Sequence, residues 1–388
     1  MLTQRQREIY DNLLRYTQTG ESFYFVDQVW EGVTYRIFAY RLASYTDFMQ
    51  PDALEGRGIM FELDASGQPV RLACRPMHKF FNLNENPSTM NLDLSRNNIE
   101  IVMDKADGSL ISTWTDHNGK LQLKSKTSLF SDQVQMAWKA LKAEPPCSFT
   151  TPEDETIDIT LLGWLNHIAS TGLVTVNLEY VGPDNRIVLG YEKAQLRVLN
   201  TRELATGEYE WSMHYWDQHP LFPYAAGSKP VGFDLDTVKP GQGYEGVVVV
   251  LSSGEWFKLK TDWYATLHHT KDSINSKRRL FECVINEATD DLKAMFSEDA
   301  LAMKQIVDME ALVIPQYNHF LKVVNDFYGV NKDLDRKSYA IKGQQELRRE
   351  LFSQAMNLYL GKANDWKAWA IKHYEIFGVK DEVISQEE

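Results

Sequence analysis

Cysteine is scarce in this chain of 388 residues, which contains only Cys74, Cys147 and Cys283. These residues are far apart, odd in number and without CxxC spacing, so the sequence supports neither a disulfide framework nor a zinc knuckle. Long apolar runs are also missing, because none approaches the roughly 20 residues that span a bilayer. We therefore expect a cytoplasmic protein with no membrane-spanning segment.

Positive charge is in deficit, since 41 Lys and Arg face 54 Asp and Glu and the net charge is −13. Proteins that bind nucleic acid tightly and nonspecifically usually present a basic surface to the phosphates, and this balance disfavours that class. Net charge averages over all faces, however, and a local groove of Lys and Arg can dominate within a Debye length of about 8 Å. An enzyme that grips nucleic-acid ends transiently is therefore not excluded.

Internal repeats and low-complexity runs are absent as well, and 43% hydrophobic with 24% charged residues is typical of a soluble globular protein. The length suggests two or three domains. Strand patterns dominate up to about residue 265, whereas helical spacing of apolar residues dominates from residue 280 to the end. The sequence therefore predicts an α+β domain at residues 1–265, followed by an all-α domain at residues 266–388.

The pattern also predicts individual elements. Residues 4–18, 129–142 and roughly 153–169 have helical spacing, and the last of these has acidic residues in its first turn. Residues 201–243 hold many Pro, Gly and aromatic residues, which indicates a long irregular connection. Strands are expected at residues 34–40, 58–63, 70–74, 99–103, 110–114, 173–181, 186–191, 196–199, 246–251 and 256–260.

The most specific local motif is Lys-Ala-Asp-Gly-Ser at residues 105–109, directly after an apolar strand. A lysine at a strand end beside a turn can lie close to a phosphate and still be partly desolvated. Desolvation and nearby cations disfavour the ammonium form, so that the neutral amine becomes a nucleophile. A surface lysine before an ordinary hairpin turn is the competing interpretation of Lys105, and the rest of the chain decides between them.

Four further charged residues favour the nucleophile. Glu179 places a carboxylate in an apolar strand, where an unpaired charge is costly, and Glu245 does the same at the start of the last hairpin. Lys258 and Lys260 lie two apart, so their side chains leave one face of a strand together and can clamp a polyphosphate. Taken singly, each of these four residues is equally typical of a charge on an edge strand or of a solvated lysine face. Together with Lys105, however, they indicate nucleotidyl transfer.

This set of residues resembles the signature of covalent nucleotidyltransferases, which comprise DNA ligases, RNA ligases and mRNA capping enzymes. Longer runs narrow the resemblance to the bacteriophage RNA ligase 1 family, from near residue 10 to about residue 300. It implies a nucleotidyltransferase domain with ATP-grasp-like antiparallel sheets at residues 1–265. The runs that carry it are residues 51–61, 75–85, 185–189, 257–264 and 290–295.

The resemblance implies an ATP-dependent RNA ligase that joins 5′-phosphate and 3′-hydroxyl RNA ends with Mg²⁺. Lys105 matches the lysine that takes AMP from ATP and releases pyrophosphate. AMP then moves to the 5′-phosphate end, and the 3′-hydroxyl attacks that end and expels AMP. Because every step is attack at phosphorus, alignment and charge neutralisation should supply most of the catalysis.

The resemblance also assigns the remaining site residues position by position. Glu245 matches a metal-associated carboxylate and Asp290 an acidic residue near a metal, although the pair Asp290-Asp291 equally suits a helix cap. Besides Lys105, six residues match positions that contact ATP, its ribose or its phosphates: Tyr40, Arg57, Lys79, Glu179, Lys258 and Lys260.

The RNA contacts are less defined. Residues 124–126 and Arg75 suit an RNA path or, equally, a solvated strand face. The basic residues between 332 and 349 suit a solvated helix surface, but in related phage enzymes the helical domain contributes to preference for broken tRNA. Nicked tRNA is therefore the expected substrate and a monomer the expected state.

Two alternatives stay open. The first is a DNA ligase or a capping guanylyltransferase, which the helices after Tyr264, in place of an oligonucleotide-binding barrel, disfavour. The second is a non-catalytic RNA-end-binding protein on the same fold, which has no need for all five residues of the signature.

Overall fold

The computed structural model describes residues 2–96, 98–150, 156–185, 187, 189–211, 226–230, 232–268, 276–297 and 299–380. The chain divides into two compact units, Met1–His268 and His269–Glu388. The boundary expected at residue 265 lies inside α6 (Asp262–His268) of the first unit. Within the described ranges, no helix has both the length and the apolar character that a membrane span requires.

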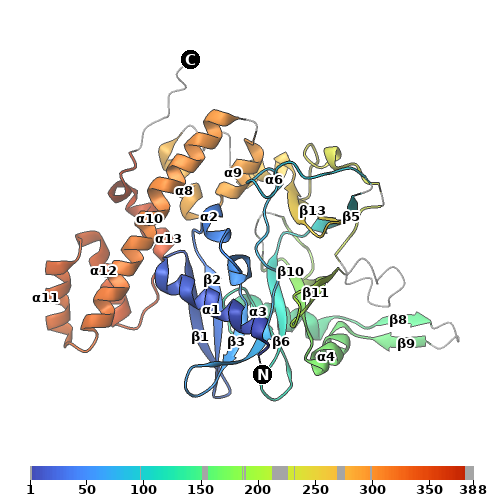
Figure 1. Ribbon diagram of the computed structural model, residues 1–388, viewed down its shortest axis with the longest axis horizontal. Coiled ribbons are helices and arrows are strands. Elements are labelled where there is room, and N and C mark those ends of the chain that lie inside the picture. The colour runs from blue at the N-terminus through green and yellow to red at the C-terminus, as the bar shows by residue number, and fades with distance from the viewer. Residues whose placement is uncertain are drawn as a thin grey trace. The chain divides into compact units, whose positions relative to one another are not determined.

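The first unit begins with a helix on a four-stranded antiparallel sheet (Figure 1). The predicted helix is confirmed as α1 (Gln4–Thr19), which starts at a capping box of Thr3 and Gln6. Ile9 and Leu13 of its apolar face are fully buried in one core with the sheet. The sheet has the order β1 (Phe23–Trp30), β2 (Val33–Tyr40), β3 (Met60–Leu63) and β4 (Pro69–Cys74); α2 (Tyr45–Phe48) and η1 (Ala53–Gly56) lie between β2 and β3 in the chain.

Three further sheets build the rest of this unit. A five-stranded sheet has the order β12-β11-β10-β6-β7, a three-stranded sheet has the order β14-β13-β5, and β8 pairs with β9; every pairing of these described strands is antiparallel. Alternating strand patterns with turns between them thus lead to antiparallel sheets, as the sequence predicts. The bounds are β5 (Ile99–Lys105), β6 (Ser109–Thr115), β7 (Leu121–Lys124), β8 (Cys147–Thr150), β9 (Thr156–Ile159), β10 (Val174–Val181), β11 (Gln195–Glu203), β12 (Tyr209–Trp211), η3 (Leu235–Thr237), β13 (Gly246–Leu251) and β14 (Trp256–Lys260).

The two larger of these sheets meet where β5 ends and β6 begins. β5 belongs to the three-stranded sheet and β6 to the five-stranded one, so the chain passes from one sheet to the other within Ala106–Gly108. Lys105 is therefore the last residue of a strand at the junction of two sheets. The helices α3 (Asp132–Ala143) and α4 (Leu161–Thr171) cover the five-stranded sheet, and their apolar residues share its core.

The second unit is helical throughout its regular elements in residues 276–297 and 299–380, as the sequence predicts. Phe281, Phe320 and Phe377 form an aromatic core with Trp369, whose side chain is 4% exposed. Trp369 is therefore a packing residue of the helical unit. The elements are α8 (Lys277–Ile285), α9 (Thr289–Met295), α10 (Ala300–Asn331), α11 (Arg336–Glu346), α12 (Arg349–Tyr359), α13 (Trp366–Lys372) and η4 (Tyr374–Phe377).

One predicted helix is correct only in its second part, and one predicted strand is absent where the structure describes it. The helix expected at residues 153–169 is instead β9 followed by α4, because Thr160 caps the helix and its hydroxyl accepts from the Gly163 N–H. Residues 151–155 lie outside the described residues. The strand expected at residues 186–191 is absent at residues 187 and 189–191. That segment hydrogen-bonds to the loop after Lys105 instead of to a neighbouring strand.

The irregular connection expected at residues 201–243 is only partly correct. β11 continues to Glu203, and β12 pairs with it where Asn200 faces Trp211. Aromatic residues in this stretch therefore form strand pairs as well as loops. Residues 212–225 and 231 lie outside the described part of the chain.

Candidate active site

The predicted nucleophile lies next to a predicted carboxylate and one lysine of the predicted clamp. Lys105 Nζ donates to Glu245 Oε2 at 2.9 Å, and Lys260 Nζ lies 3.2 Å from Glu245 Oε1. The carboxylate is 2% exposed, while the Lys105 side chain is 21% exposed. Two ammonium groups thus share one buried carboxylate, and Lys105 is partly desolvated, as expected for a strand-end lysine.

Strand register explains why these three residues meet. Gly246 is the first residue of β13, and in the three-stranded sheet it faces both Lys105 and Lys260. It has φ of +153°, and a Cβ there would lie 2.1 Å from the carbonyl oxygen of Leu259. Only glycine fits this close approach. Gly246 therefore fixes the backbone that presents Glu245 to both lysines.

The loop after Lys105 is held by a buried aspartate that the sequence analysis left without a role. Asp107 is 2% exposed, and its carboxylate accepts from the Tyr264 hydroxyl at 2.7 Å and the Leu189 N–H at 2.6 Å. The Asp107 N–H donates to the Tyr191 hydroxyl at 3.0 Å. Two features of the sequence could have indicated these contacts. Asp107 lies in the five-residue motif, and Tyr264 ends the run 257–264 that carries the family resemblance.

Glu179 lies on the other side of the same loop. The Gly108 N–H donates to Glu179 Oε1 at 3.1 Å, and a Cβ on Gly108 would lie 2.2 Å from the carbonyl oxygen of Tyr180. Glycine thus allows the motif loop to approach β10 closely. Burial raises the pKa of Glu179 to about 7, with a further contribution from Glu245, against the lowering effect of Lys105.

This pKa gives a testable pH dependence. Folding is favoured by the neutral Glu179 carboxyl below its unfolded pKa of roughly 4.3, and this contribution is lost as the pH rises through about 7. The side chain at position 179 stays neutral at every pH in the Glu179→Gln variant. The unfolding temperature of this variant, relative to that of the wild type, should therefore rise between pH 5 and pH 8. Calorimetry of both proteins measures the difference, and parallel pH profiles would contradict a raised pKa.

A cavity of about 170 Å³ opens beside these groups. Its wall carries two cations and two carboxylates, from Arg57, Lys105, Asp104 and Glu179, and the other lining residues are apolar, with Met77 and Phe80 among them. Arg57 donates from Nη1 to the Met77 carbonyl at 3.3 Å and lies 5.5 Å from the Phe80 ring centroid. An apolar pocket with a few convergent charges is typical of small-molecule sites.

Phe80 connects this cavity to the second lysine of the predicted clamp. Lys258 Nζ lies 5.9 Å from the Phe80 ring centroid, so Arg57 and Lys258 contact the same ring. In β14, Lys258 and Lys260 are half-buried while the residues between and before them are buried, which places both lysines on one face. Phe80 lies within the run 75–85 but has no role predicted from the sequence.

Tyr40 and Lys79 form a neighbouring group and do not line this cavity. The rings of Tyr40 and Phe48 are 4.8 Å apart, and Lys79 Nζ lies 5.7 Å from the Phe48 ring. Lys126 Nζ lies 4.1 Å from the Tyr40 ring centroid. The structure thus brings these two residues near each other, through Phe48, and their contact with ATP stays a prediction.

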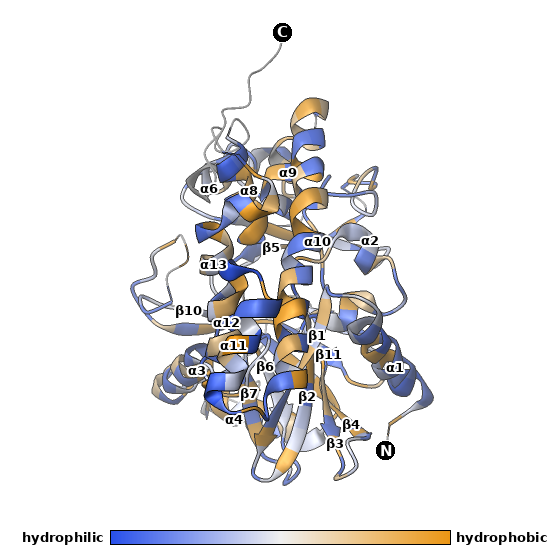
Figure 2. Ribbon diagram, turned by 90° about the vertical axis from the view of Figure 1, so that its left-hand side faces the viewer, coloured by the Kyte–Doolittle hydropathy of each residue, from blue (hydrophilic) through white to orange (hydrophobic). Residues whose placement is uncertain are grey.

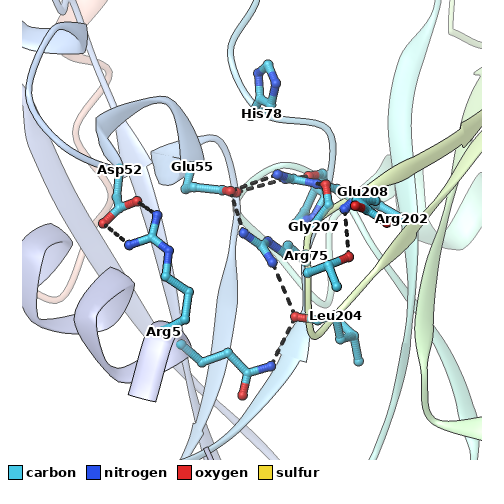
Figure 3. A network of polar contacts seen from close by, with 12 residues as sticks. Arg5, Asp52, Glu55, Arg75, His78, Arg202, Leu204, Gly207 and Glu208 are labelled. Carbon is cyan, nitrogen blue, oxygen red and sulfur yellow. Dashed lines mark hydrogen bonds and ion pairs between the residues drawn. The ribbon is translucent and has the colours of Figure 1, made fainter. Parts of the chain in front are cut away.

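A buried ion-pair network is centred on Glu55, two residues before Arg57 in the sequence (Figure 3). The Glu55 carboxylate accepts from Arg75 at 2.9 Å and from Arg202 at 2.7 and 2.8 Å. Arg202 also donates to the Pro76 carbonyl at 2.6 Å. The network therefore connects η1, which precedes Arg57, to the end of β4 and to β11.

The same network overturns part of the expected RNA path. Arg75 is 3% exposed and paired with Glu55, and Lys124 is fully buried. Lys124 Nζ donates to the carbonyls of Gly58 at 2.9 Å and Ser125 at 2.8 Å, which replace its water shell. Burial lowers the pKa of Lys124 to about 8. Neither an RNA path nor a solvated strand face is correct for Arg75 and Lys124.

Glu55 should contribute strongly to stability. Burial would raise its pKa, but the Arg202 and Arg75 guanidinium groups lower it to about 2. Glu55→Gln leaves two buried guanidinium groups without their counter-charge, which should cost about 3–5 kcal/mol of unfolding free energy. Denaturant unfolding at pH 7 measures this loss, and the exposed Glu8→Gln is the matched control.

The sign of the pH dependence follows from the lowered pKa of Glu55. Its contribution is fully present above the unfolded value of roughly 4.3 and is lost as the pH falls toward 2. The difference in stability between Glu55→Gln and the wild type should therefore shrink in acid. An unchanged difference at pH 3 would contradict the assignment.

Neither predicted metal residue belongs to a cluster of metal ligands within its own unit, among the residues that the structure describes. Asp290 belongs to the helical unit, where its carboxylate accepts from the Asp291 N–H at 3.0 Å in the first turn of α9. Glu245 is engaged by two lysines. In the described ranges, no group of three or more His, Cys, Asp or Glu side chains could hold an ion. The metal roles of Asp290 and Glu245 stay predictions.

Comparison with known proteins identifies the family. A model described as RNA ligase matches residues 55–219, and a model described as T4 RNA ligase 1, C-terminal domain, matches residues 271–374. A putative RNA ligase of Thermovibrio ammonificans is 24% identical over 334 residues, which are 83% of this chain and 82% of that protein. RNA ligase 1 of bacteriophage TS2126 is 28% identical over 226 residues, 56% of this chain and 52% of the phage protein.

Two solved structures are also similar. They are form 2 and form 1 of an archaeal ATP-dependent RNA ligase, both with a TM-score of 0.44 and with 12% and 11% identity. The similarity covers 94% of this chain and 95% of the first structure, and 90% and 96% for the second. On the two family models and the curated relatives, the chain belongs to the bacteriophage RNA ligase 1 family, whose members are enzymes that join RNA ends.

Proposed function

We propose that this protein is an ATP-dependent RNA ligase that carries AMP covalently on Lys105. The observation that carries the proposal is the arrangement of Lys105, Glu245 and Lys260 in one ion-paired group. Beside it, Arg57 and Glu179 line the same cavity as Lys105. A nucleophile, paired carboxylates and phosphate-binding cations at one pocket suit nucleotidyl transfer.

In the first step, the Lys105 ammonium gives a proton to solvent, and the neutral amine attacks the α-phosphorus of ATP. A nitrogen–phosphorus bond forms, the bond to the bridging oxygen breaks, and pyrophosphate leaves. The amine nitrogen loses its proton in this step, and Glu245, 2.9 Å away, is the nearest assigned acceptor. Lys258 and Lys260 offset the charge that develops on the leaving pyrophosphate.

Two transfers complete the reaction. An oxygen of the RNA 5′-phosphate attacks the AMP phosphorus, so the bond to Lys105 breaks and the amine regains a proton. The 3′-hydroxyl of the second RNA end then loses its proton and attacks the 5′-phosphorus, and AMP leaves. Alignment of the two ends supplies much of the rate in such steps.

The other nucleotide contacts are assigned as follows. Arg57 and Lys79 bind phosphates, as guanidinium and ammonium groups do, and Tyr40 contacts the nucleoside by stacking or hydrogen bonding. Glu179, held by the Gly108 N–H at the cavity wall, faces the ribose or a metal. Glu179 must be ionised for a metal role, so its raised pKa ties that role to neutral or higher pH.

Magnesium is the metal that we assign to the reaction. Mg²⁺ in nucleotide sites is held by one or two carboxylates together with substrate phosphates, which suits a site without a preformed cluster. Glu245 and Asp290 are the proposed carboxylates, and Glu245 must then exchange a lysine contact for the ion. When bound, the ion withdraws electron density from the phosphate oxygens.

The proposed substrate is nicked tRNA, repaired in the cytoplasm by a monomeric enzyme. The helical unit matches the C-terminal domain model of the family, and it carries exposed basic residues that suit RNA phosphates. These residues are Lys332, Arg336, Lys337, Arg348 and Arg349.

End joining tests the proposal against its alternatives. A 5′-phosphorylated single-stranded RNA should be circularised or joined with ATP, and the matched DNA should not. Equal joining of DNA would favour a DNA ligase. RNA binding without any joined product or AMP transfer would leave the non-catalytic end-binding protein.

A further inference from the structure

A second surface of the first unit has the composition of a nucleic-acid groove. A cleft of about 810 Å³ is lined by residues of α3, α4 and β7 and by the residue before β7. Both helices contact β7, and the three elements lie side by side in Figure 2. Lys120, Lys139 and Lys142 line the cleft with Trp138, and no acidic side chain lines it. In a chain with a net charge of −13, three lysines at one cleft form a local positive site.

Local structure places these lysines together. Lys139 and Lys142 are three apart on α3, so they leave the same side of the helix, and Lys120 directly precedes β7. All three are exposed. Asp116, the nearest carboxylate in sequence to Lys120, is 2% exposed and accepts hydrogen bonds from the Lys120 N–H and the Gln122 amide.

An aromatic ring accompanies the charges. Trp138 is partly buried against the core of the five-stranded sheet, and Lys142 Nζ lies 5.5 Å from its ring centroid. Stacking on an aromatic ring within a positively charged groove is how proteins bind single-stranded nucleic acid without sequence preference. Charge and aromatic character together match RNA better than an apolar or acidic partner.

We propose that the α3–α4 cleft binds a single-stranded segment of the RNA substrate away from the ends that are joined. The inference rests on the proposed RNA ligase function and adds a second RNA contact to it. Phosphates contact Lys120, Lys139 and Lys142, and a base stacks on the exposed part of Trp138. None of these residues takes part in the lysyl-AMP chemistry assigned to Lys105.

The test is the affinity of the full chain for a fluorescent single-stranded RNA of about 20 nucleotides, the length scale of one or two single-strand binding sites. The wild type is compared with the triple variant Lys120→Gln/Lys139→Gln/Lys142→Gln. The Kd of the triple variant for this RNA should be at least ~10-fold higher than that of the wild type at low salt. The slope of log K against log salt should fall by about 2, since each phosphate contact on a single strand contributes roughly 0.7. Transfer of AMP from ATP to Lys105 should be unchanged.

The matched control is Lys304→Gln/Lys322→Gln/Lys367→Gln, which removes the same charge from exposed lysines of the helical unit. It should keep the wild-type affinity and salt slope. Equal weakening in both triple variants, or an unchanged affinity in the cleft variant, would overturn the proposal. An unchanged RNA affinity in the cleft variant would favour an acidic protein as the partner of the cleft instead of RNA. Wild-type protein that takes no AMP would instead refute the ligase function, while the RNA affinity still tests the cleft.

Discussion

Replacing Lys105 by alanine is expected to reduce joining of 5′-phosphorylated RNA at least ~1,000-fold, because AMP then has no nitrogen to which it can be attached. The variant should still seal RNA that already carries AMP on its 5′-phosphate, since Lys105 forms no bond in that step. Gel assays with the two RNA substrates measure both reactions. The contrast between them isolates the covalent step from RNA binding and from sealing.

Lys105→Arg is the matched control for the ion pair. Arginine keeps a cation opposite Glu245, 2.9 Å from the present amine, but its guanidinium does not become a neutral nucleophile. Both variants should lose joining of 5′-phosphorylated RNA to a similar extent. Joining near the wild-type rate in the arginine variant would show that Lys105 acts only through its charge.

Replacing Lys258 and Lys260 by alanine is expected to slow AMP transfer from ATP by ~100-fold or more, because each removes a cation from the leaving pyrophosphate. Binding of RNA should persist, since Lys260 is paired with Glu245 in the site and neither lysine lines the α3–α4 cleft. Single-turnover transfer from labelled ATP measures the rate, and RNA affinity is measured in parallel.

Lys304→Ala/Lys322→Ala is the matched control, because both lysines are exposed and form only surface pairs four residues apart on α10. The control should transfer AMP at the wild-type rate. If AMP transfer survived in the Lys258/Lys260 variant, the assignment of these lysines to the phosphates would be wrong.

The sequence predicts the location of those candidate site residues that lie at strand ends. Lys105 and Lys260 end strands, and Glu245 directly precedes one, so alternation and turn residues were enough to place them at the ends of β5, β14 and β13. The pairing of these strands was not predictable. It joins residue 105 to residue 246 through a sheet order that depends on the whole unit.

Buried charge was the main error, for a physical reason. A lysine or arginine in a short strand suits solvent equally well on sequence alone. Arg75 is buried because Glu55, 20 positions away, and Arg202, 147 positions from Glu55, meet it in one network. Lys124 is buried because backbone carbonyls surround its ammonium group. Such partners are set by tertiary structure and leave no local pattern.

The helix expected at residues 153–169 shows a related limit. Its apolar residues suit helix or strand, and the boundary depends on whether Thr160 acts as a cap. The aromatic and charged lining of the α3–α4 cleft was likewise invisible, because Lys120 and Lys142 come from different elements.

The most direct measurement is incubation of the wild-type protein with α-labelled ATP and Mg²⁺, followed by a denaturing gel and peptide mapping. The proposed mechanism predicts label that survives denaturation and maps to the peptide containing Lys105, and no label on Lys105→Ala. Folded protein that takes up no label, or label on another lysine, would contradict it.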